Sequence, residues 1–458
     1  MTLVSAFQHE PYGRSTVSAG TKDEPQGGPD PGFEPVPGPE PVFYRGAACR
    51  AAKSHAESTH RACSPADTLQ RILPVLSIAG ITRLADVTGL DRIGIPTILA
   101  MRPNAPTLSN SSGKGFSTVD ATVSAAMEGI ELFCAEEEDR FSFDVVKATY
   151  DELDRSGMVP PVELLPFSRY SLFHRSVPED WVFGWDLIGQ REVAVPFEVV
   201  TMTPGHVAAR KPVRFSFQVG SNGLASGNVF LEAVCSGLAE VIERDAVTCA
   251  NVRTGHDVGG LPRVALGSIC FERVRSLLER LRSRGILPIL LDCTGDTEVA
   301  TFEAYLVDDE LPSTGTFRGY GAHLHPEVAM VRALTEAVQS RAVYIAGSRD
   351  DMTTLEHLRL RSRSSRALYE LARREDGVDA SSIQSRATGS FEGDCHALLD
   401  SLRKVGLPSA VVVDLSLPEL EVSVVRVVVP GLEGYSAFPY YAPGPRAASA
   451  ALQGRGQG

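Results

Sequence analysis

The chain has 458 residues, of which 43% are hydrophobic and 22% charged. This is an ordinary composition for a globular protein, with enough chain for about two or three domains or one large one. The formal net charge of −13 argues against non-specific binding to nucleic acid or to an anionic membrane, because both need a basic surface.

The sequence also shows no membrane span, no signal peptide and no paired-cysteine motif. No apolar run reaches the ~20 residues of a membrane span, and the first residues lack the basic and apolar regions of a secretory signal peptide. The eight cysteines include no Cys-x-x-Cys pair, so neither a zinc knuckle nor a disulfide framework is expected. We therefore expect reduced thiols and a cytoplasmic location.

The chain divides into three parts by composition. Residues 1–59 are predicted to form a disordered arm, because Gly and Pro dominate between Gly20 and Pro41 and too few apolar residues remain to offset the entropy of ordering. Residues 60–446 are predicted to form the folded domain. Residues 447–458 are predicted to be a flexible tail.

Helices and strands alternate irregularly through the folded part. Ser64 and Pro65 are typical of a helix start, and a polar loop, LSNSSGKGFS, separates two early strands from the next helix. Helices are predicted at about 119–138, 268–284, 326–347 and 394–404. Strands are predicted at 81–87, 95–101, 192–202, 214–219, 286–292, 301–307, 409–415 and 421–429. The irregular order favours an α+β fold with mixed sheets over a doubly wound one.

The most informative stretch is SNGLASGNVFLEAVCSGLAEVIERDA, residues 221–246. It predicts a small-residue loop and then a helix capped by Asn228. Glu232, Glu240 and Glu243 fall on one face of that helix, opposite an apolar stripe. Like charges at this spacing repel, so basic side chains or divalent cations must offset them, and Mg²⁺ prefers such oxygen ligands.

A second helix repeats this pattern. Ser124, Glu128 and Glu131 share one face, and Lys114 precedes them in a Gly-Lys-Gly turn. That turn does not match the P-loop spacing, but a lysine between glycines before a helix can meet a phosphate.

A third helix carries Arg332, Glu336 and Gln339 on one face, and the Gln339 amide can donate to and accept from a base or ribose. Each of the three patterns alone is typical of a solvated helix face. Together they indicate an acidic site for a metal ion and a nucleotide.

These motifs, in this order, resemble the YcaO family. The resemblance covers SNGLASGNVFLEAVCSGLAEVIERDA, SAAMEGIEL behind GKG, GYGAHLHPEVAMVRALTEAVQSR and VVVPGLEG, within residues 60–446. It implies a YcaO-type ATP-binding α+β fold with mixed or antiparallel sheets flanked by helices. It also implies Mg²⁺ ligands at Glu128, Glu131, Glu232, Glu240 and Glu243, and contacts to ATP from Lys114, Ser124, Asn228, Arg244, Gln339 and Arg341. One departure is that Leu132 stands where many members have an arginine.

The resemblance further implies an activity. Family members use ATP to phosphorylate the oxygen of a peptide backbone amide, after which a nucleophile adds to the amide carbon and phosphate leaves. A side-chain thiol or hydroxyl would give an azoline, an amine an amidine, and sulfide a thioamide. This chain lacks the Pro-x-Pro-x-Pro end of azoline-forming members, and its first third is similar to the TfuA-associated branch, which points to thioamide formation.

Several expectations about partners and rival functions remain open at this point. We expect a precursor peptide or protein as substrate, a TfuA-like partner and a homodimer. A metal-dependent hydrolase using the same carboxylates and a non-catalytic scaffold are the alternatives. His323 and His325, two residues apart, could be read as a pair of metal ligands, but we interpret them as part of a turn before the helix that starts near Pro326.

Overall fold

The computed structural model describes residues 39–56, 59–136, 140–202, 215–311, 314–348 and 366–455. The helices are α1 (Pro65–Ile72), α2 (Thr118–Glu136), α3 (Tyr150–Arg155), α4 (Phe230–Arg253), α5 (Glu272–Ser283), α6 (Pro326–Ala346), α8 (Arg366–Ala372), α9 (Phe391–Lys404) and α10 (Pro445–Arg455). None of the helices in these ranges combines the length and the apolar character that crossing a membrane requires.

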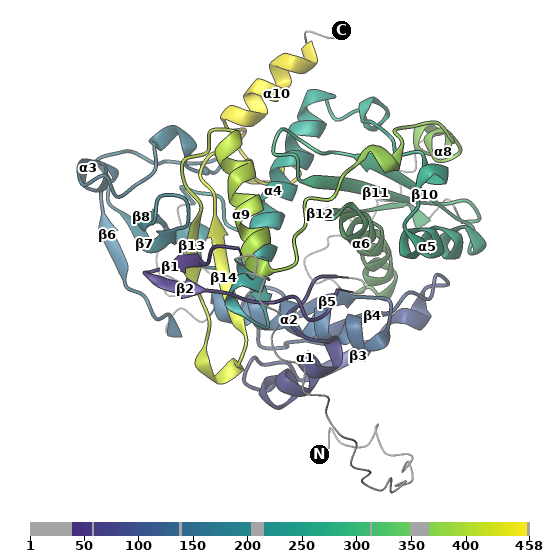
Figure 1. Cartoon of the computed structure of the whole chain (residues 1–458), viewed down its shortest axis with the longest axis horizontal. Helices are drawn as coiled ribbons and strands as arrows, with labels where there is room; N and C mark the ends of the chain where they lie inside the picture. Colours follow the sequence, from purple (N-terminus) through teal and green to yellow (C-terminus); the bar gives the residue numbers. More distant parts are fainter. Residues whose placement is uncertain are drawn as a thin grey trace, which may run out of the picture. The chain divides into compact units, whose positions relative to one another are not determined.

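The strands form separate sheets, in which all neighbouring strands run antiparallel (Figure 1). The strands are β1 (Val42–Tyr44), β2 (Ala47–Cys49), β3 (Arg83–Asp86), β4 (Thr97–Met101), β5 (Asn110–Lys114), β6 (Val145–Ala148), β7 (Glu179–Asp186), β8 (Arg191–Pro196), β9 (Leu224–Gly227), β10 (Ile286–Asp292), β11 (Ala300–Asp308), β12 (Thr316–His323), β13 (Val411–Asp414) and β14 (Ser423–Val428). Their orders are β1-β2, β3-β4-β5, β10-β11-β12 and β6-β7-β13-β14-β9, with β8 pairing β7. The predicted α+β class with sheets flanked by helices is confirmed.

Three long helices each pack on the edge of a different sheet. Helix α2 lies on β4 and β5, α4 on β9 and β14, and α6 on β11 and β12 (Figure 1). Because β5, β9 and β12 are edge strands, each keeps one row of backbone N–H and C=O groups free of its own sheet. These free edges lie beside the helices that carry the acidic faces.

Glycines in these edge strands allow the helices to approach closely. A Cβ atom on Gly113 would lie 2.0 Å from the backbone nitrogen of Ala125, and one on Gly321 would lie 2.2 Å from the carbonyl oxygen of Ala329. Neither obstacle can move without displacing helix backbone. The short strand-to-helix distance therefore depends on the absence of a side chain at these positions.

Replacing Gly113 with alanine is expected to lower the free energy of unfolding by about 1–3 kcal/mol, the usual cost of overpacking. The inserted methyl group must push α2 away from β5. Chemical denaturation of the variant measures the loss. Gly389→Ala is the matched control, because no atom lies within 4 Å of its added Cβ and its φ is not positive; equal stability of the two variants would contradict the close-packing argument.

Several predicted boundaries differ from the structure. The polar loop LSNSSGKGFS contains strand β5, and the small-residue loop before the acidic helix contains β9. Helix α4 begins at Phe230 with Val229 as its N-cap, so Asn228 does not cap it. The strand predicted at 214–219 is, over its described residues, only an isolated bridge from Phe217 to Phe167.

Both predicted unstructured ends also contain regular structure. The hairpin β1-β2 lies within residues 1–59, and its Val42 is buried against the core, whereas residues 1–38 lie outside the described ranges. At the other end, α10 packs on α4 and buries Ala447 and Ala450. The compositional argument did not predict the hairpin β1-β2 or helix α10, because short strands and alanine-rich helices need tertiary contacts to form. The domain boundaries at 60 and 446 remain predictions.

Candidate functional site

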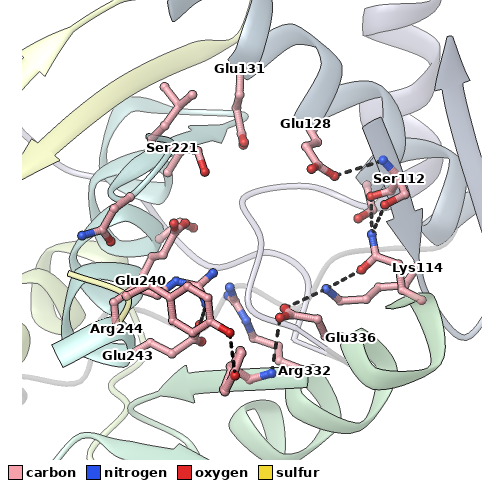
Figure 2. Close-up of a pocket in the computed structure, with 18 of the residues that line it drawn as sticks. Ser112, Lys114, Glu128, Glu131, Ser221, Glu240, Glu243, Arg244, Arg332 and Glu336 are labelled. Atoms are coloured by element: carbon pink, nitrogen blue, oxygen red, sulfur yellow. Dashed lines mark hydrogen bonds and ion pairs between the residues drawn. The ribbon is translucent and has the colours of Figure 1, made fainter. Parts of the chain in front are cut away.

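A cavity of about 1560 Å³ opens between helices α2, α4 and α6 and the edge strands β5, β9 and β12. Ten of the eleven predicted site residues line it: Lys114, Ser124, Glu128, Glu131, Asn228, Glu232, Glu240, Glu243, Arg244 and Gln339. Figure 2 shows carboxylates from separate helices facing one shared opening. The predicted gathering of distant acidic segments is therefore present in the fold.

Backbone amides of the edge strands hold the carboxylates in place. Ser112 N–H on β5 donates to Glu128 at 3.2 Å. On β9, Ser226 donates to Glu131 through its N–H at 2.8 Å and through its hydroxyl at 2.6 Å.

The strand β12 does the same for two more acids. Ala322 N–H donates to Glu243 at 2.8 Å, and Tyr320 N–H donates to Glu336 at 3.3 Å. Positions 320 and 322 are two residues apart, so their N–H groups point the same way and both lie on the free edge of the strand. Each sheet edge thus fixes acidic side chains at the cavity wall.

Burial makes the charged form of these carboxylates costly. It raises the pKa of Glu128 and of Glu243 to about 7 and the pKa of Glu131 to about 8. Burial also raises the pKa of Glu240, and no hydrogen bond to the Glu240 carboxylate is found among the described residues. Glu243 is buried and Glu128, Glu131 and Glu240 are half-buried. A further positive charge in the cavity would favour their ionised form, and this set of oxygen donors fits hard divalent cations such as Mg²⁺.

Arg244 supplies a positive charge beside these carboxylates. Its guanidinium lies 3.6 Å from a Glu243 oxygen and stacks on the rings of Tyr320 and Tyr435 at 5.6 and 5.5 Å. Although burial disfavours the charge, Glu243 and Glu240 raise the pKa of Arg244. Arg244 therefore stays charged and can meet an anion in the cavity.

Lys114 links β5 to α6. Its ammonium donates to Gln339 at 2.9 Å and to Glu336 at 3.3 Å, and the Gln339 amide donates to Ser112 (Figure 2). Although burial opposes ionisation, Lys114, Arg244 and Arg332 together lower the pKa of Glu336. Lys114, Glu336 and Gln339 therefore form a hydrogen-bonded polar part of the cavity lining.

Glu232 differs from the other acids because protein donors already surround it. Arg61 donates to it at 3.2 Å, Ala62 N–H at 3.0 Å, and the Asn228 backbone N–H and side-chain amide at 3.3–3.4 Å. Its predicted role as a metal ligand remains a prediction. The predicted role of Asn228 as a nucleotide contact is likewise untested, although both residues line the cavity.

Arg341 is not brought to the cavity. Its side chain is 3% exposed and pairs with Asp91 at 3.0 Å and with Asp308 at 3.0 Å. It lies nine residues after Arg332 on the same helix, which is half a turn around the axis at about 100° per residue. The predicted nucleotide contact is therefore replaced by a structural ion pair.

Arg61, Arg332 and Glu336 are among the residues that line the cavity without having been assigned to it. Arg332 and Glu336 were found on one helix face with Gln339, but only Gln339 was given a role. Arg61 comes from the segment before α1, for which the sequence offered no signal. Glu336 could have been predicted as a site residue, because it shares a helix face with Gln339, which was already assigned to the site.

Without cations, the thermal stability of the protein is expected to fall as the pH rises from about 5.5 to about 8.5. The raised pKa values of Glu128, Glu131 and Glu243 mean that the folded protein binds more protons than the unfolded chain in this window. Deprotonation then destabilises the fold. Thermal unfolding with and without Mg²⁺ and a non-hydrolysable ATP analogue measures this effect; the ligands should remove most of the fall. A melting temperature that rises across this window without ligands would contradict it.

Comparisons with known proteins are consistent with this geometry. A family model described as YcaO cyclodehydratase, ATP- and Mg²⁺-binding, matches residues 112–433. An uncharacterised protein of Methanothermobacter thermautotrophicus is 37% identical over 392 residues, which are 83% of this chain and 96% of that protein. An uncharacterised protein of Rhizobium leguminosarum bv. trifolii, named as lying in the tfuA 3′ region, is 34% identical over 81% of this chain and 88% of that protein.

Two solved structures share the fold. The YcaO protein of Methanopyrus kandleri, bound with AMPPCP and Mg²⁺, matches with a TM-score of 0.66 at 24% identity, covering 86% of this chain and 99% of that one. A heterocyclase in complex with substrate and cofactor matches with a TM-score of 0.72 at 22% identity, covering 89% of this chain. The match spans only 56% of the heterocyclase chain, so the remainder of that protein has no counterpart in the match.

Proposed function

The chain belongs to the YcaO family, and from this membership we propose that it uses ATP and Mg²⁺ to activate a backbone amide of a peptide or protein. The single observation that carries the proposal is the set of buried carboxylates from α2 and α4 that face one cavity. A scaffold protein has no need to keep such costly groups together. A hydrolase using the same carboxylates without ATP is less well supported, because the family is described as ATP-binding.

Separate groups of residues would hold the cations and contact the phosphates. Glu128, Glu131, Glu240 and Glu243 would hold the cations, with the edge-strand amides fixing three of these carboxylates. Lys114 and Arg244 would place positive charge beside the phosphates. ATP supplies, when bound, the phosphoryl group that turns the amide oxygen into a leaving group.

Closure of the site against water is the remaining requirement, since an activated amide would otherwise be lost to hydrolysis. The cavity rim includes Phe116, Phe438 and the segment 218–222. Phe116 and Phe438 are 39% and 40% exposed, which is unusual for phenylalanine and leaves them available to a peptide. We propose that the substrate covers this rim when it binds.

Thioamide formation with a TfuA-type partner is the specific reaction that we favour. A relative that is 34% identical is named for its place beside tfuA. The alternative outcomes are an azoline from a side-chain nucleophile and an amidine from an amine.

The test combines the purified chain, Mg²⁺, ATP, sulfide and a TfuA-like protein with short peptides encoded beside its gene, followed by mass spectrometry. Exchange of one oxygen for one sulfur would confirm thioamide formation. Loss of one water would instead identify the azoline-forming reaction. ATP turnover that needs neither peptide nor partner would contradict amide activation altogether.

A further inference from the structure

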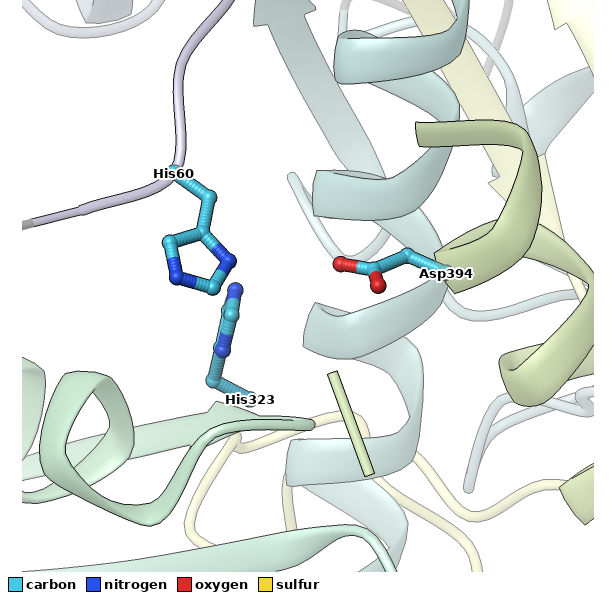
Figure 3. A group of neighbouring side chains, drawn as sticks. All are labelled: His60, His323 and Asp394. Atoms are coloured by element: carbon cyan, nitrogen blue, oxygen red, sulfur yellow. The ribbon is translucent and has the colours of Figure 1, made fainter. Parts of the chain in front are cut away.

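A second cluster of chemically capable side chains lies beside the cavity. His60 on the segment before α1, His323 at the end of β12 and Asp394 in the first turn of α9 bring their ligand atoms within 4.8 Å of one another (Figure 3). A separate cavity of about 30 Å³ adjoins all three, which is room for a single ion or water. Imidazole and carboxylate are ligands that Zn²⁺ accepts, so a metal centre is the first interpretation to test.

Lys53 already contacts two of these three residues. Its ammonium lies 2.5 Å from Asp394 Oδ2, 3.1 Å from His60 Nδ1 and 2.8 Å from the carbonyl oxygen of Thr388. An ammonium has three protons and no lone pair, so these three acceptors use its whole bonding capacity. The Lys53 side chain is 4% exposed, and so is that of Asp394. The buried carboxylate thus already has a matched cation.

The hydrogen bonds also fix both imidazoles in a form that cannot bind metal at Nε2. His60 Nδ1 accepts from Lys53, and His323 Nδ1 accepts from the backbone N–H of His325 at 2.9 Å. A neutral imidazole that accepts at Nδ1 carries its proton on Nε2. Burial lowers the pKa of His60 to about 4 and the pKa of His323 well below its usual value, so both rings are neutral.

The cluster joins the N-terminal segment to α9. Ala51 N–H donates to Glu392 at 3.0 Å, and Phe391 N–H donates back to the Ala51 carbonyl at 3.0 Å. Lys53 adds the buried ion pair to Asp394 one turn further along the helix. Backbone hydrogen bonds pair His55 with Arg61, and Arg61 lines the main cavity.

The two residues that follow His60 donate to one acidic residue of the site. The Arg61 guanidinium and the Ala62 N–H both donate to Glu232, at 3.2 and 3.0 Å. Arg61 itself lines the main cavity and the small one. Because Lys53 contacts His60, the neighbour of Arg61 in the chain, the Lys53 ion pair and the Arg61 ion pair are linked through His60.

We propose that Lys53, His60 and Asp394 form an ammonium-centred latch, not a metal site, and that this latch positions Arg61 and Glu232 at the wall of the ATP cavity. The latch residues touch neither cavity contents nor cations, so they are positioning residues. This inference rests on the proposed function in one respect, namely that the cavity binds ATP with Mg²⁺.

The test measures the affinity for AMPPCP with Mg²⁺ by calorimetry in the full chain. Lys53→Met should weaken binding by about tenfold, the size expected when a group supporting a binding residue is removed. Because this variant leaves Asp394 buried without its cation, it should lose stability as well, and the double variant Lys53→Met/Asp394→Leu removes that penalty. The latch predicts that the double variant regains stability while its affinity stays about tenfold weak.

The matched control is Lys404→Met on α9, the helix that carries Asp394. Lys404 pairs with Glu298, and both side chains are more than half exposed. This variant should leave affinity unchanged. Wild-type affinity in the folded double variant would overturn the latch. Zn²⁺ added alone to dialysed protein provides the second arm: one bound zinc per chain that Asp394→Leu removes would also overturn it.

Hydrogen exchange separates this inference from the proposed function. If the wild-type chain bound no nucleotide, the function would fail, but amide exchange of Arg61 and Ala62 would still report on the latch. Exchange at these amides should be at least about tenfold faster in the double variant than in Lys404→Met. Unchanged exchange would overturn the latch whatever the cavity binds.

Discussion

Glu243→Gln is expected to abolish peptide-dependent ADP release, by on the order of 100-fold or more, while the protein stays folded. The substitution removes one negative charge from the cavity wall and replaces a hard oxygen ligand with an amide. Its carbonyl oxygen can still accept from Ala322 N–H, the bond that holds Glu243 now. Steady-state ADP release with a peptide substrate, together with circular dichroism, measures both parts of the prediction.

Stability should not fall, because burial already raises the pKa of Glu243 to about 7 and makes its charge costly in the cation-free protein. A neutral side chain of the same shape relieves that cost. Glu279→Gln, on the exposed face of α5, is the matched control and should keep full activity. Normal turnover by the folded Glu243→Gln variant would remove the carboxylate assignment and with it the basis of the proposed chemistry.

The acidic residues could be predicted from the sequence because helices repeat with a fixed period. Glu240 and Glu243, or Glu128 and Glu131, share a face whatever the helix packs against. The prediction needed no knowledge of the sheets. The list of eleven site residues came from the resemblance to the YcaO family, and ten of them line one cavity.

The edge strands could not be predicted in the same way. β5 reads Asn-Ser-Ser-Gly-Lys and β9 reads Leu-Ala-Ser-Gly, and both were interpreted as loops because glycine and serine disfavour strands. The structure shows why small residues stand there: β5 and β9 must let a helix approach within van der Waals distance of the strand backbone. The requirement comes from tertiary packing, which local propensity does not record.

Arg341 is the predicted site residue that does not line the cavity. Its assignment rested on resemblance in the motif that ends TEAVQSR, whereas helical periodicity alone places Arg341 about 160° from Gln339 on its helix, at about 100° per residue. The periodicity argument and the resemblance differ at this residue, and the position of Arg341 outside the cavity lining agrees with periodicity. Motif membership placed the helix at the site but could not decide which side of it faces the cavity.

Arg341→Met is therefore expected to lower the free energy of unfolding by about 3–5 kcal/mol, the usual cost of breaking a buried ion pair from one side. The guanidinium joins Asp91, before β4, to Asp308 at the end of β11, and all three side chains are at most 4% exposed. Removing it leaves buried carboxylates short of their cation. Chemical denaturation of the variant measures the loss.

The affinity for AMPPCP with Mg²⁺ in the folded variant distinguishes the two roles of Arg341. A structural ion pair predicts unchanged affinity, whereas a nucleotide contact predicts weaker binding at nearly normal stability. Arg373→Met calibrates the stability effect, because its pair with Asp309 is exposed on both sides and should contribute at most about 1 kcal/mol. Asp308 retains Arg92 at 2.6 Å in the Arg341 variant, so Asp91 should bear most of the loss. Adding Asp91→Leu to Arg341→Met should then recover part of the stability, and failure to recover any would show that the arginine acts through something other than this ion pair.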